Sequence, residues 1–215
     1  MGSAANALID RLPRNESWVK GRSHCDKCKH TLEWYDLIPI VSYLSLGGKC
    51  RYCHFPIPAR NLIVEIFLGT GLVLVSNLGI LSNLGKAELF LILWVTTIIA
   101  VMDFETKLVS EAMVLSWAVL TVVFHLSNLG NLSYLGGAVA GTLIIGGLWA
   151  GTRGKAMGFG DVEIAAVMGY FLGWQNLLVG LWLAFVTGAI YGVGLIIKRK
   201  AKLKSEIAFG PFLIL

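Results

Sequence analysis

Two aspartates stand at the edges of apolar stretches, where charged side chains are rare. Asp103 directly follows the apolar run at 90–102, and Asp161 ends a Gly-Phe-Gly-Asp tetrapeptide that precedes a later run. A charged side chain near the centre of a membrane helix costs about 2.5–3.5 kcal/mol on insertion scales, so such residues usually have a function. Acid–base catalysis by two carboxyl groups needs one as a base and one as an acid, and like charges a few ångströms apart do not both ionise. The sequence therefore predicts acid–base chemistry by Asp103 and Asp161 at a membrane surface.

The residues around the second aspartate support this prediction and also permit a simpler hypothesis. Gly158 and Gly160 lack side chains, so an extended substrate can approach the backbone beside Asp161. In the simpler hypothesis, both aspartates are interfacial residues that Arg153 and Lys155 neutralise.

All four cysteines lie in one polar segment near the N-terminus. They form two CxxC pairs, Cys25 with Cys28 and Cys50 with Cys53, separated by 21 residues. Two such pairs place four thiolates around one tetrahedral ion, and the spacing is slightly longer than the usual separation of about 15–20 residues. A closed four-thiolate site leaves no open position for catalysis. The sequence therefore predicts a structural zinc ion that folds this segment.

Disulfide and redox roles of the cysteines fit the sequence less well than a metal site. Disulfide bonds are disfavoured in a reducing cytoplasm, and a redox-active CxxC normally occurs singly in a βαβ pattern. His24, His30 and His54 flank the pairs and offer alternative ligands. Because four thiolates already complete a site, we interpret these histidines as bystanders.

The composition indicates a membrane protein. Hydrophobic residues make up 56% of the 215 residues and charged residues only 14%, unlike the balance of a soluble domain. No nucleotide-binding loop is visible, and we expect no nucleic-acid partner. The predicted apolar segments are 62–80, 87–102, 112–126, 132–150, 162–178 and 178–197, with a last one opening near 207.

The basic residues predict the orientation of these segments. When the connections are assigned alternately to the two sides, all of the 18 Lys and Arg except Lys86 fall on one side. The positive-inside rule makes that side cytoplasmic. Asp103 then leaves the membrane on the cytoplasmic side and Asp161 enters it from the same side, so the two side chains can meet.

We therefore expect an all-α polytopic membrane protein with a small cytoplasmic zinc-binding module. The predicted parts are the end of a truncated first transmembrane helix at 1–9, the zinc module at 10–61 and a transmembrane helical domain at 62–215. The segment at 1–9 is apolar but too short to span a bilayer, and it lacks the basic start of a signal peptide.

Five stretches of the sequence resemble, in this order, the prepilin peptidases, also called type IV leader peptidases. They are GSAANALIDRLPRNESW, SHCDKCKHTLEWYDLIPIVSYLSLGGKCRYCHFPIPARNLIVEI, MDFETKLVSE, GFGD and FGPFL, and they extend over essentially the whole chain. A GxGD motif alone is unspecific. The ordered set, with the tryptophan-containing stretch between two CxxC pairs, is very specific.

The resemblance implies a membrane aspartic endopeptidase of a bacterial inner membrane, with Asp103 and Asp161 as the catalytic pair at the cytoplasmic face. Its partners would be the lipid bilayer and pilin-like precursors of type IV pilus, type II secretion or competence systems. The enzyme removes a short basic leader from such precursors. Many members also N-methylate the new N-terminus with S-adenosylmethionine.

The sequence departs from the family pattern near both aspartates. A Val-Ser-Glu tripeptide ending at Glu111 stands where the family usually has an aliphatic residue, proline and aspartate, and Glu163 replaces a common lysine after the GFGD motif. The leader is basic and so is the cytoplasmic face of the protein. We therefore expect local anions, namely Glu105, Glu111 and Glu163, to attract the leader.

Two other functions stay open on the sequence alone. A methyltransferase dominated by the zinc module would need an S-adenosylmethionine site, for which no independent motif is visible. A transporter or pilus-assembly scaffold would use the two aspartates as a proton relay, and would show inverted repeats and broken helices at the midplane of the membrane. We find no such repeat in the sequence.

Overall fold

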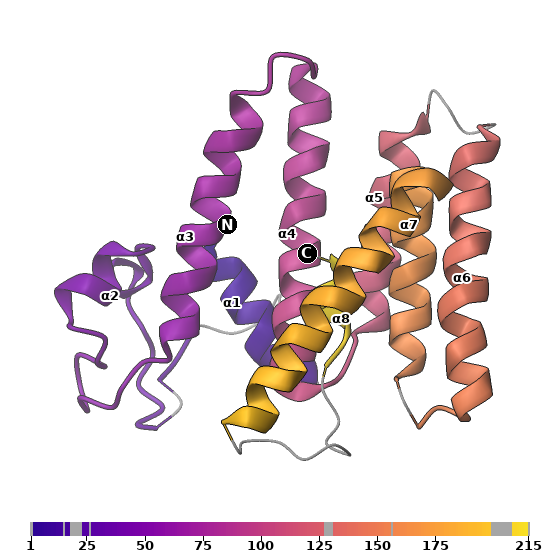
Figure 1. Cartoon of the computed structure of the whole chain (residues 1–215). Coiled ribbons are helices and arrows are strands. Elements are labelled where there is room, and N and C mark those ends of the chain that lie inside the picture. The colour runs from indigo at the N-terminus through magenta and orange to yellow at the C-terminus, as the bar shows by residue number, and fades with distance from the viewer. Residues whose placement is uncertain are drawn as a thin grey trace. The chain divides into compact units, whose positions relative to one another are not determined.

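The computed structural model describes residues 2–14, 16–17, 23–25, 27–126, 131–155, 157–198 and 208–214. These residues form helices and two isolated β-bridges, and no sheet is found among them (Figure 1). The α-helices are α1 (Gly2–Arg11), α2 (Val41–Ser45), α3 (Ala59–Ser76), α4 (Asn83–Thr106), α5 (Glu111–Phe124), α6 (Leu132–Thr152), α7 (Phe159–Ile197) and α8 (Gly210–Ile214). Two short 3-10 helices are η1 (Leu12–Arg14) and η2 (Trp34–Leu37).

Four of these helices are long and apolar enough to cross a membrane, namely α3, α4, α6 and α7. The fifth apolar helix, α5, has only 14 residues. Much of the large aliphatic surface of these helices is exposed, as expected for surface that contacts lipid. The chain is therefore an all-α, multi-pass membrane protein, as its composition predicts.

The chain divides into two compact units, Met1–Ile98 and Ile99–Leu215. In the first unit, α1 packs against the start of α3. The side-chain amide of Asn6 donates to a backbone carbonyl of α3 at 3.1 Å, and Arg60 forms an ion pair with Asp10 at 2.8 Å. These polar contacts attach α1 to the beginning of a membrane span.

In the second unit, glycines bring α6 and α7 into close contact. A Cβ on Gly137 would collide with the carbonyl group of Gly169, and a Cβ on Gly169 would collide with that of Gly137. Gly141 lies in the same way against the backbone of Ala165. Small residues allow membrane helices to approach this closely. The GGAVAG stretch at 136–141 therefore serves helix packing.

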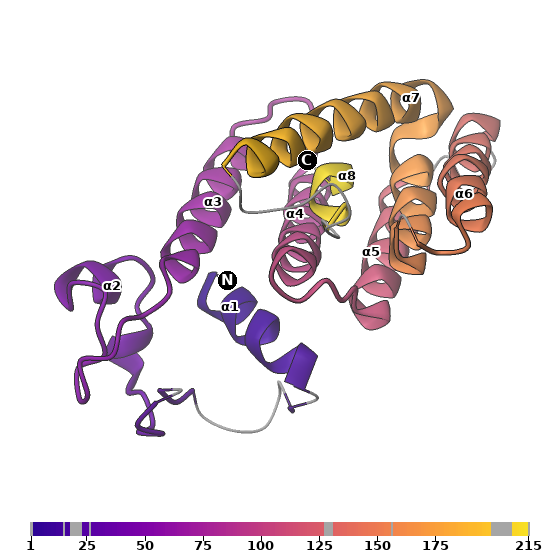
Figure 2. The ribbon, with the colours of Figure 1, turned by 60° about the horizontal axis from the view of Figure 1, so that its bottom comes forward.

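Within the second unit, α7 turns back on itself (Figures 1 and 2). The helical geometry is interrupted at Gly173, where φ is 76° and ψ is 163°, a conformation essentially restricted to glycine. A Cβ there would also lie 2.8 Å from Oγ of Ser133. The sequence predicts two spans meeting at residue 178, and the structure places the break five residues earlier. Hydropathy alone does not locate the break, because the run is apolar on both sides of it.

The short helix α8 and the residue before it pack against the second half of α7 (Figure 2). The rings of Phe185 and Phe209 lie 5.0 Å apart, and those of Tyr191 and Phe212 lie 5.5 Å apart. This packing brings the start of α8 to the C-terminal end of α4, where Asp103 lies.

Candidate active site and cysteine cluster

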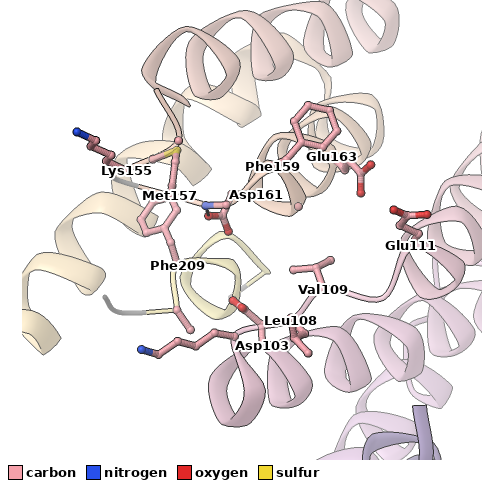
Figure 3. Close-up of a pocket in the computed structure, with 15 residues that line it drawn as sticks. Asp103, Leu108, Val109, Glu111, Lys155, Met157, Phe159, Asp161, Glu163 and Phe209 are labelled. Atoms are coloured by element: carbon pink, nitrogen blue, oxygen red, sulfur yellow. Dashed lines mark hydrogen bonds between the residues drawn. The ribbon is translucent and has the colours of Figure 1, made fainter. Parts of the chain in front are cut away.

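The second unit contains a cavity of about 390 Å³ between the end of α4, the start of α5, the start of α7 and the segment before α8 (Figure 3). Its lining combines acidic, basic and apolar side chains with the backbone of the GFGD motif. The lining residues include Asp103, Lys107, Leu108, Val109, Glu111, Lys155, Met157, Phe159, Asp161, Glu163 and Phe209.

Asp103 lies in the last turn of α4 and is almost fully buried. The helix ends because Lys107 adopts a left-handed conformation with φ 56°, and its N–H donates to the carbonyl oxygen of Asp103 at 2.8 Å. Oδ2 of Asp103 is buried and has no hydrogen-bond partner among the described residues. A buried oxygen without a partner is suited to bind a water molecule or a substrate group in the cavity.

Asp161 lies in the first turn of α7 and is likewise buried. Gly158 is the N-cap residue of the helix, and its N–H donates to Oδ2 of Asp161 at 3.2 Å. A carboxylate at this position also interacts favourably with the helix dipole. The GFGD motif thus places its own aspartate at a helix N-terminus.

The two carboxyl groups reach the same cavity from different helices (Figure 3). Each aspartate is at most 6% exposed, and the two lie close enough to interact electrostatically. Lys155 lines the cavity, but neither aspartate forms an ion pair with a residue in the described part of the chain. The hypothesis that Arg153 and Lys155 neutralise the aspartates therefore finds no support.

The two glycines of the motif have different surroundings. Gly158 is exposed and lines the cavity, and an added Cβ would meet only the backbone nitrogen of Gly160, at 3.9 Å, which suits the predicted approach of a substrate backbone. Gly160 instead packs against the linker between α4 and α5, where an added Cβ would lie 2.7 Å from Cβ of Val109. Gly160 therefore has a packing role that its sequence context does not predict.

The predicted anions are not equivalent. Glu111, at the start of α5, and Glu163, in α7, both line the cavity and lie opposite each other (Figure 3). Glu105 is exposed and is not among the lining residues. The structure thus brings two of the three glutamates to the cavity that the aspartates line.

The segment that precedes and opens α8 contributes to the cavity, which the sequence pattern does not predict. Ala208 and Phe209 line the cavity, and an added Cβ on Gly210 would lie only 2.6 Å from Oδ2 of Asp103. Phe209 and Gly210 belong to the FGPFL stretch, for which the sequence alone indicates no role. Within this stretch, Gly210 is the residue that indicates a close approach of the backbone to another group, because glycine has no side chain.

In the first unit, the four cysteines come together. Their Sγ atoms all lie within 4.8 Å of one another, and those of Cys25 and Cys53 are 3.7 Å apart. A tetrahedral zinc site with bonds of about 2.3 Å to sulfur has sulfur–sulfur edges of about 3.8 Å. The cluster therefore has the donor set and the dimensions to bind a metal ion.

Two loops of the same shape present the cysteines. In each loop, the residue four positions after the first cysteine donates its N–H to that cysteine's carbonyl at 2.9 Å, Lys29 to Cys25 and His54 to Cys50. Lys29 and His54 both have positive φ, 57° and 53°. The N–H of each first cysteine bonds in turn to the carbonyl five residues on. The sequence does not reveal this repeat, because the turn residues have different side chains and neither is glycine.

The backbone of the first loop prepares Cys25 for metal binding. Burial acts to raise the pKa of Cys25, but hydrogen bonds from the backbone of Cys28 and Lys27 outweigh it and lower the pKa to about 7. Such a thiol readily supplies the thiolate that metals bind. The flanking histidines are not part of the cluster, and the ring of His30 contacts that of Tyr52 instead, with centroids 3.6 Å apart.

Comparison with known proteins gives matches along the chain. Residues 1–78 match the bacterial peptidase A24 N-terminal domain, and residues 90–193 match the type IV leader peptidase family. The prepilin leader peptidase/N-methyltransferase of Aeromonas hydrophila is 34% identical over 213 residues, which cover 95% of this chain and 72% of that relative. The chain belongs to the type IV leader peptidase family.

Other relatives agree with this family membership. The prepilin leader peptidase/N-methyltransferase of Aeromonas salmonicida (strain A449) is 34% identical over 200 residues, covering 89% of this chain and 68% of the relative. That of Bacillus subtilis (strain 168) is 30% identical over 208 residues, covering 94% of this chain and 81% of the relative. No solved structure shows a significant match. In this leader peptidase, the N-terminal match contains the four cysteines and the second match contains both aspartates.

A Gly160→Ala substitution should reduce the activity of this leader peptidase and its thermal stability. The added methyl group would collide with Val109 and displace the start of α7, at a cost of about 1–3 kcal/mol. Val109→Gly in the same chain should restore part of both properties, because it removes the Cβ that the new methyl group would meet at 2.7 Å together with both Cγ atoms. Gly147→Ala is the control, because Gly147 faces open space. A Gly160→Ala defect that Val109→Gly leaves unchanged would show that Gly160 acts in another way.

Proposed function

We propose that this leader peptidase is a membrane aspartic endopeptidase that removes the leader from pilin-like precursors, with Asp103 and Asp161 as its catalytic pair. The observation that carries the proposal is a pair of buried carboxyl groups on two helices that line one cavity, in a chain of a peptidase family. Pilin-like precursors are the proposed substrates because the relatives are named prepilin leader peptidases. Type IV pilus assembly, type II secretion and competence are the processes that use such substrates. Family membership favours this function over a proton-relay transporter or an assembly scaffold.

In the proposed reaction, Asp161 is the base and Asp103 is the acid. Asp161 takes a proton from water while the hydroxyl oxygen bonds to the scissile carbonyl carbon, and Asp103 gives its proton to the carbonyl oxygen. When the tetrahedral intermediate collapses, the C–N bond breaks, the proton on Asp161 passes to the amine nitrogen and a hydroxyl proton returns to Asp103. The roles follow from the helix dipoles, because an anion is favoured at the start of α7 and disfavoured at the end of α4.

The product mass tests this proposal directly. The purified full chain, reconstituted in lipid, is incubated with a precursor that carries a short basic leader. We expect two products whose masses locate a single cut at the end of the leader. An intact precursor, in the presence of correctly folded chain, would overturn the proposed function.

We propose N-methylation of the new N-terminus as a second step, because the relatives' names contain both activities. S-adenosylmethionine would be the methyl donor and would act as a second substrate. The same mass measurement detects this step as one added methyl group that depends on the donor. Cleavage without methylation would show that only the peptidase activity is retained.

We also propose that Cys25, Cys28, Cys50 and Cys53 hold a structural zinc ion. The zinc would stabilise a module at 10–61, which follows the short helical segment at 1–9 and precedes a peptidase domain at 62–215. Four thiolates favour zinc, and their closed arrangement suits folding and not catalysis. The distribution of Lys and Arg favours a cytoplasmic position for both the zinc module and the active site, in a bacterial inner membrane.

Reversing the charge of Glu111 and Glu163 should raise KM for a basic leader with little change in kcat. The two carboxylates line the cavity and attract cations before the chemical step, whereas lysines would repel the leader. The measurement compares the Glu111→Lys and Glu163→Lys double variant with the wild-type chain at low and high salt. Glu105→Lys is the matched control, because Glu105 does not line the cavity. An unchanged KM in the double variant at low salt would refute the role of these anions.

A further inference from the structure

Large apolar side chains lie exposed on η2 and α2 in the first unit. Trp34 is 74% exposed, Leu44 65% and Val41 60%. Large apolar side chains that are exposed within one short segment mark a candidate contact with a protein or a membrane. None of these three residues serves the cysteine cluster or the cavity with the aspartates.

The α2 segment has two different faces. Ser42 and Tyr43 line a polar cavity of about 150 Å³ to which Glu65 also contributes. Val41 and Leu44, which are three residues apart and therefore share a face of the helix, are exposed. A short segment with one polar and one apolar face is typical of a structure that lies in a membrane interface.

A hydrogen bond sets the height of this segment along the membrane span. The N–H of Ile40, directly before α2, donates to Oε2 of Glu65 at 2.8 Å. Glu65 lies six residues after Ala59, the first residue of α3, and so about 9 Å along the helix axis. The start of α2 therefore lies beside the first turns of a membrane-spanning helix and not beyond its end (Figure 1).

The surroundings of Glu65 agree with a position of the α2 segment beside the first turns of α3. Its carboxylate accepts the Ile40 N–H, and Glu65 lines the polar cavity together with residues of α1 and the α2 segment. A Cβ on Gly2 of α1 would lie 2.7 Å from Cγ of Glu65, which shows how closely α1 covers it. The neighbouring α3 side chains Ile63 and Ile66 are exposed, as expected where the helix faces lipid.

We propose that the segment at 34–45 is an interfacial membrane anchor, whose Trp34, Val41 and Leu44 insert into the lipid interface where α3 begins. Lipid is the occupant favoured by the structure, because the segment is tied to α3 at a height where α3 itself presents apolar side chains outward. Tryptophan is also enriched at membrane–water interfaces. The anchor would hold the cysteine module at the membrane surface through the bond from Ile40 to Glu65.

Trp34 fluorescence tests this proposal in the full chain reconstituted in lipid vesicles. The emission of the wild-type chain minus that of Trp34→Phe isolates the contribution of Trp34. We expect this difference spectrum to be blue-shifted, quenched by lipids brominated near the headgroup and little affected by aqueous iodide. A red-shifted contribution that iodide quenches and brominated lipid does not would overturn the proposal.

Variants of Glu65 test the tether. Glu65→Ala removes the acceptor and should reduce the quenching of Trp34 by brominated lipid, whereas Glu65→Gln keeps an acceptor oxygen and should preserve it. Metal content and thermal stability verify that each variant is folded. A photo-crosslinker at position 44 separates the possible occupants. Lipid adducts support the anchor, and adducts confined to a second copy of the chain or to the precursor contradict it.

Discussion

Asparagine in place of either Asp103 or Asp161 should abolish leader cleavage. Positioned general acids and bases contribute about 10²–10⁴-fold each, so the loss in kcat should be at least about 100-fold for either variant. Asparagine has nearly the same shape but can neither take a proton from water nor give one to the carbonyl oxygen. The assay is the rate of cleavage of a leader-bearing precursor by the reconstituted chain, followed by product mass.

The substitutions should leave the fold intact, because asparagine fits the same space in the cavity. Metal content and thermal stability equal to those of the wild-type chain verify this. Glu88→Gln is a matched control, since Glu88 lies on α4 but does not line the cavity. If one of the two aspartate variants cleaves at the wild-type rate, the paired mechanism is wrong. The wild-type pH–rate profile should be bell-shaped, because one group must be deprotonated and the other protonated.

The hydropathy of the sequence predicts those membrane helices whose apolar runs are bounded by polar loops. The predicted spans at 87–102 and 132–150 overlap α4 and α6, because their apolar runs end at polar loops. The break in α7 was misplaced, because both of its halves are apolar and the break depends on the φ of one glycine, Gly173. For the last apolar segment, the sequence predicts only a start near residue 207 and no end. Residues 208–214 show that it contains α8, which packs on α7 through aromatic contacts that hydropathy does not register.

The sequence also predicts part of the candidate site, but not all of its residues. Asp103 and Asp161 stand out because a carboxylate at the edge of an apolar run is rare, and Cys25 and its partners stand out by spacing. The contact between Gly160 and Val109 depends on tertiary packing, and no local pattern indicates it. Glu105 and Glu111 look equivalent in the sequence, and only the end of α4 and the start of α5 determine which one reaches the cavity.

Removing the metal should unfold the cysteine module while the membrane helices stay intact. We expect about one zinc ion per chain, because the four Sγ atoms form one closed group. Structural zinc contributes about 10–16 kcal/mol of binding energy at neutral pH in small modules, and that energy is folding energy. A strong chelator should therefore release the metal, expose four reactive thiols and change the near-ultraviolet circular dichroism of the module. The far-ultraviolet signal of the membrane helices should remain.

Single substitutions distinguish the metal ligands from the bystanders. Cys28→Ser should lose the metal, whereas His24→Ala should keep about one ion per chain, because four thiolates complete the site without histidine. Metal affinity should fall as the pH falls, since only thiolates bind. The backbone of Phe55 acts to lower the pKa of Cys53, but burial and the three other thiols raise it to about 11, so metal binding at neutral pH must displace protons. A metal-free chain with a folded module, or His24→Ala without metal, would show that the cysteines do not form the site proposed for them.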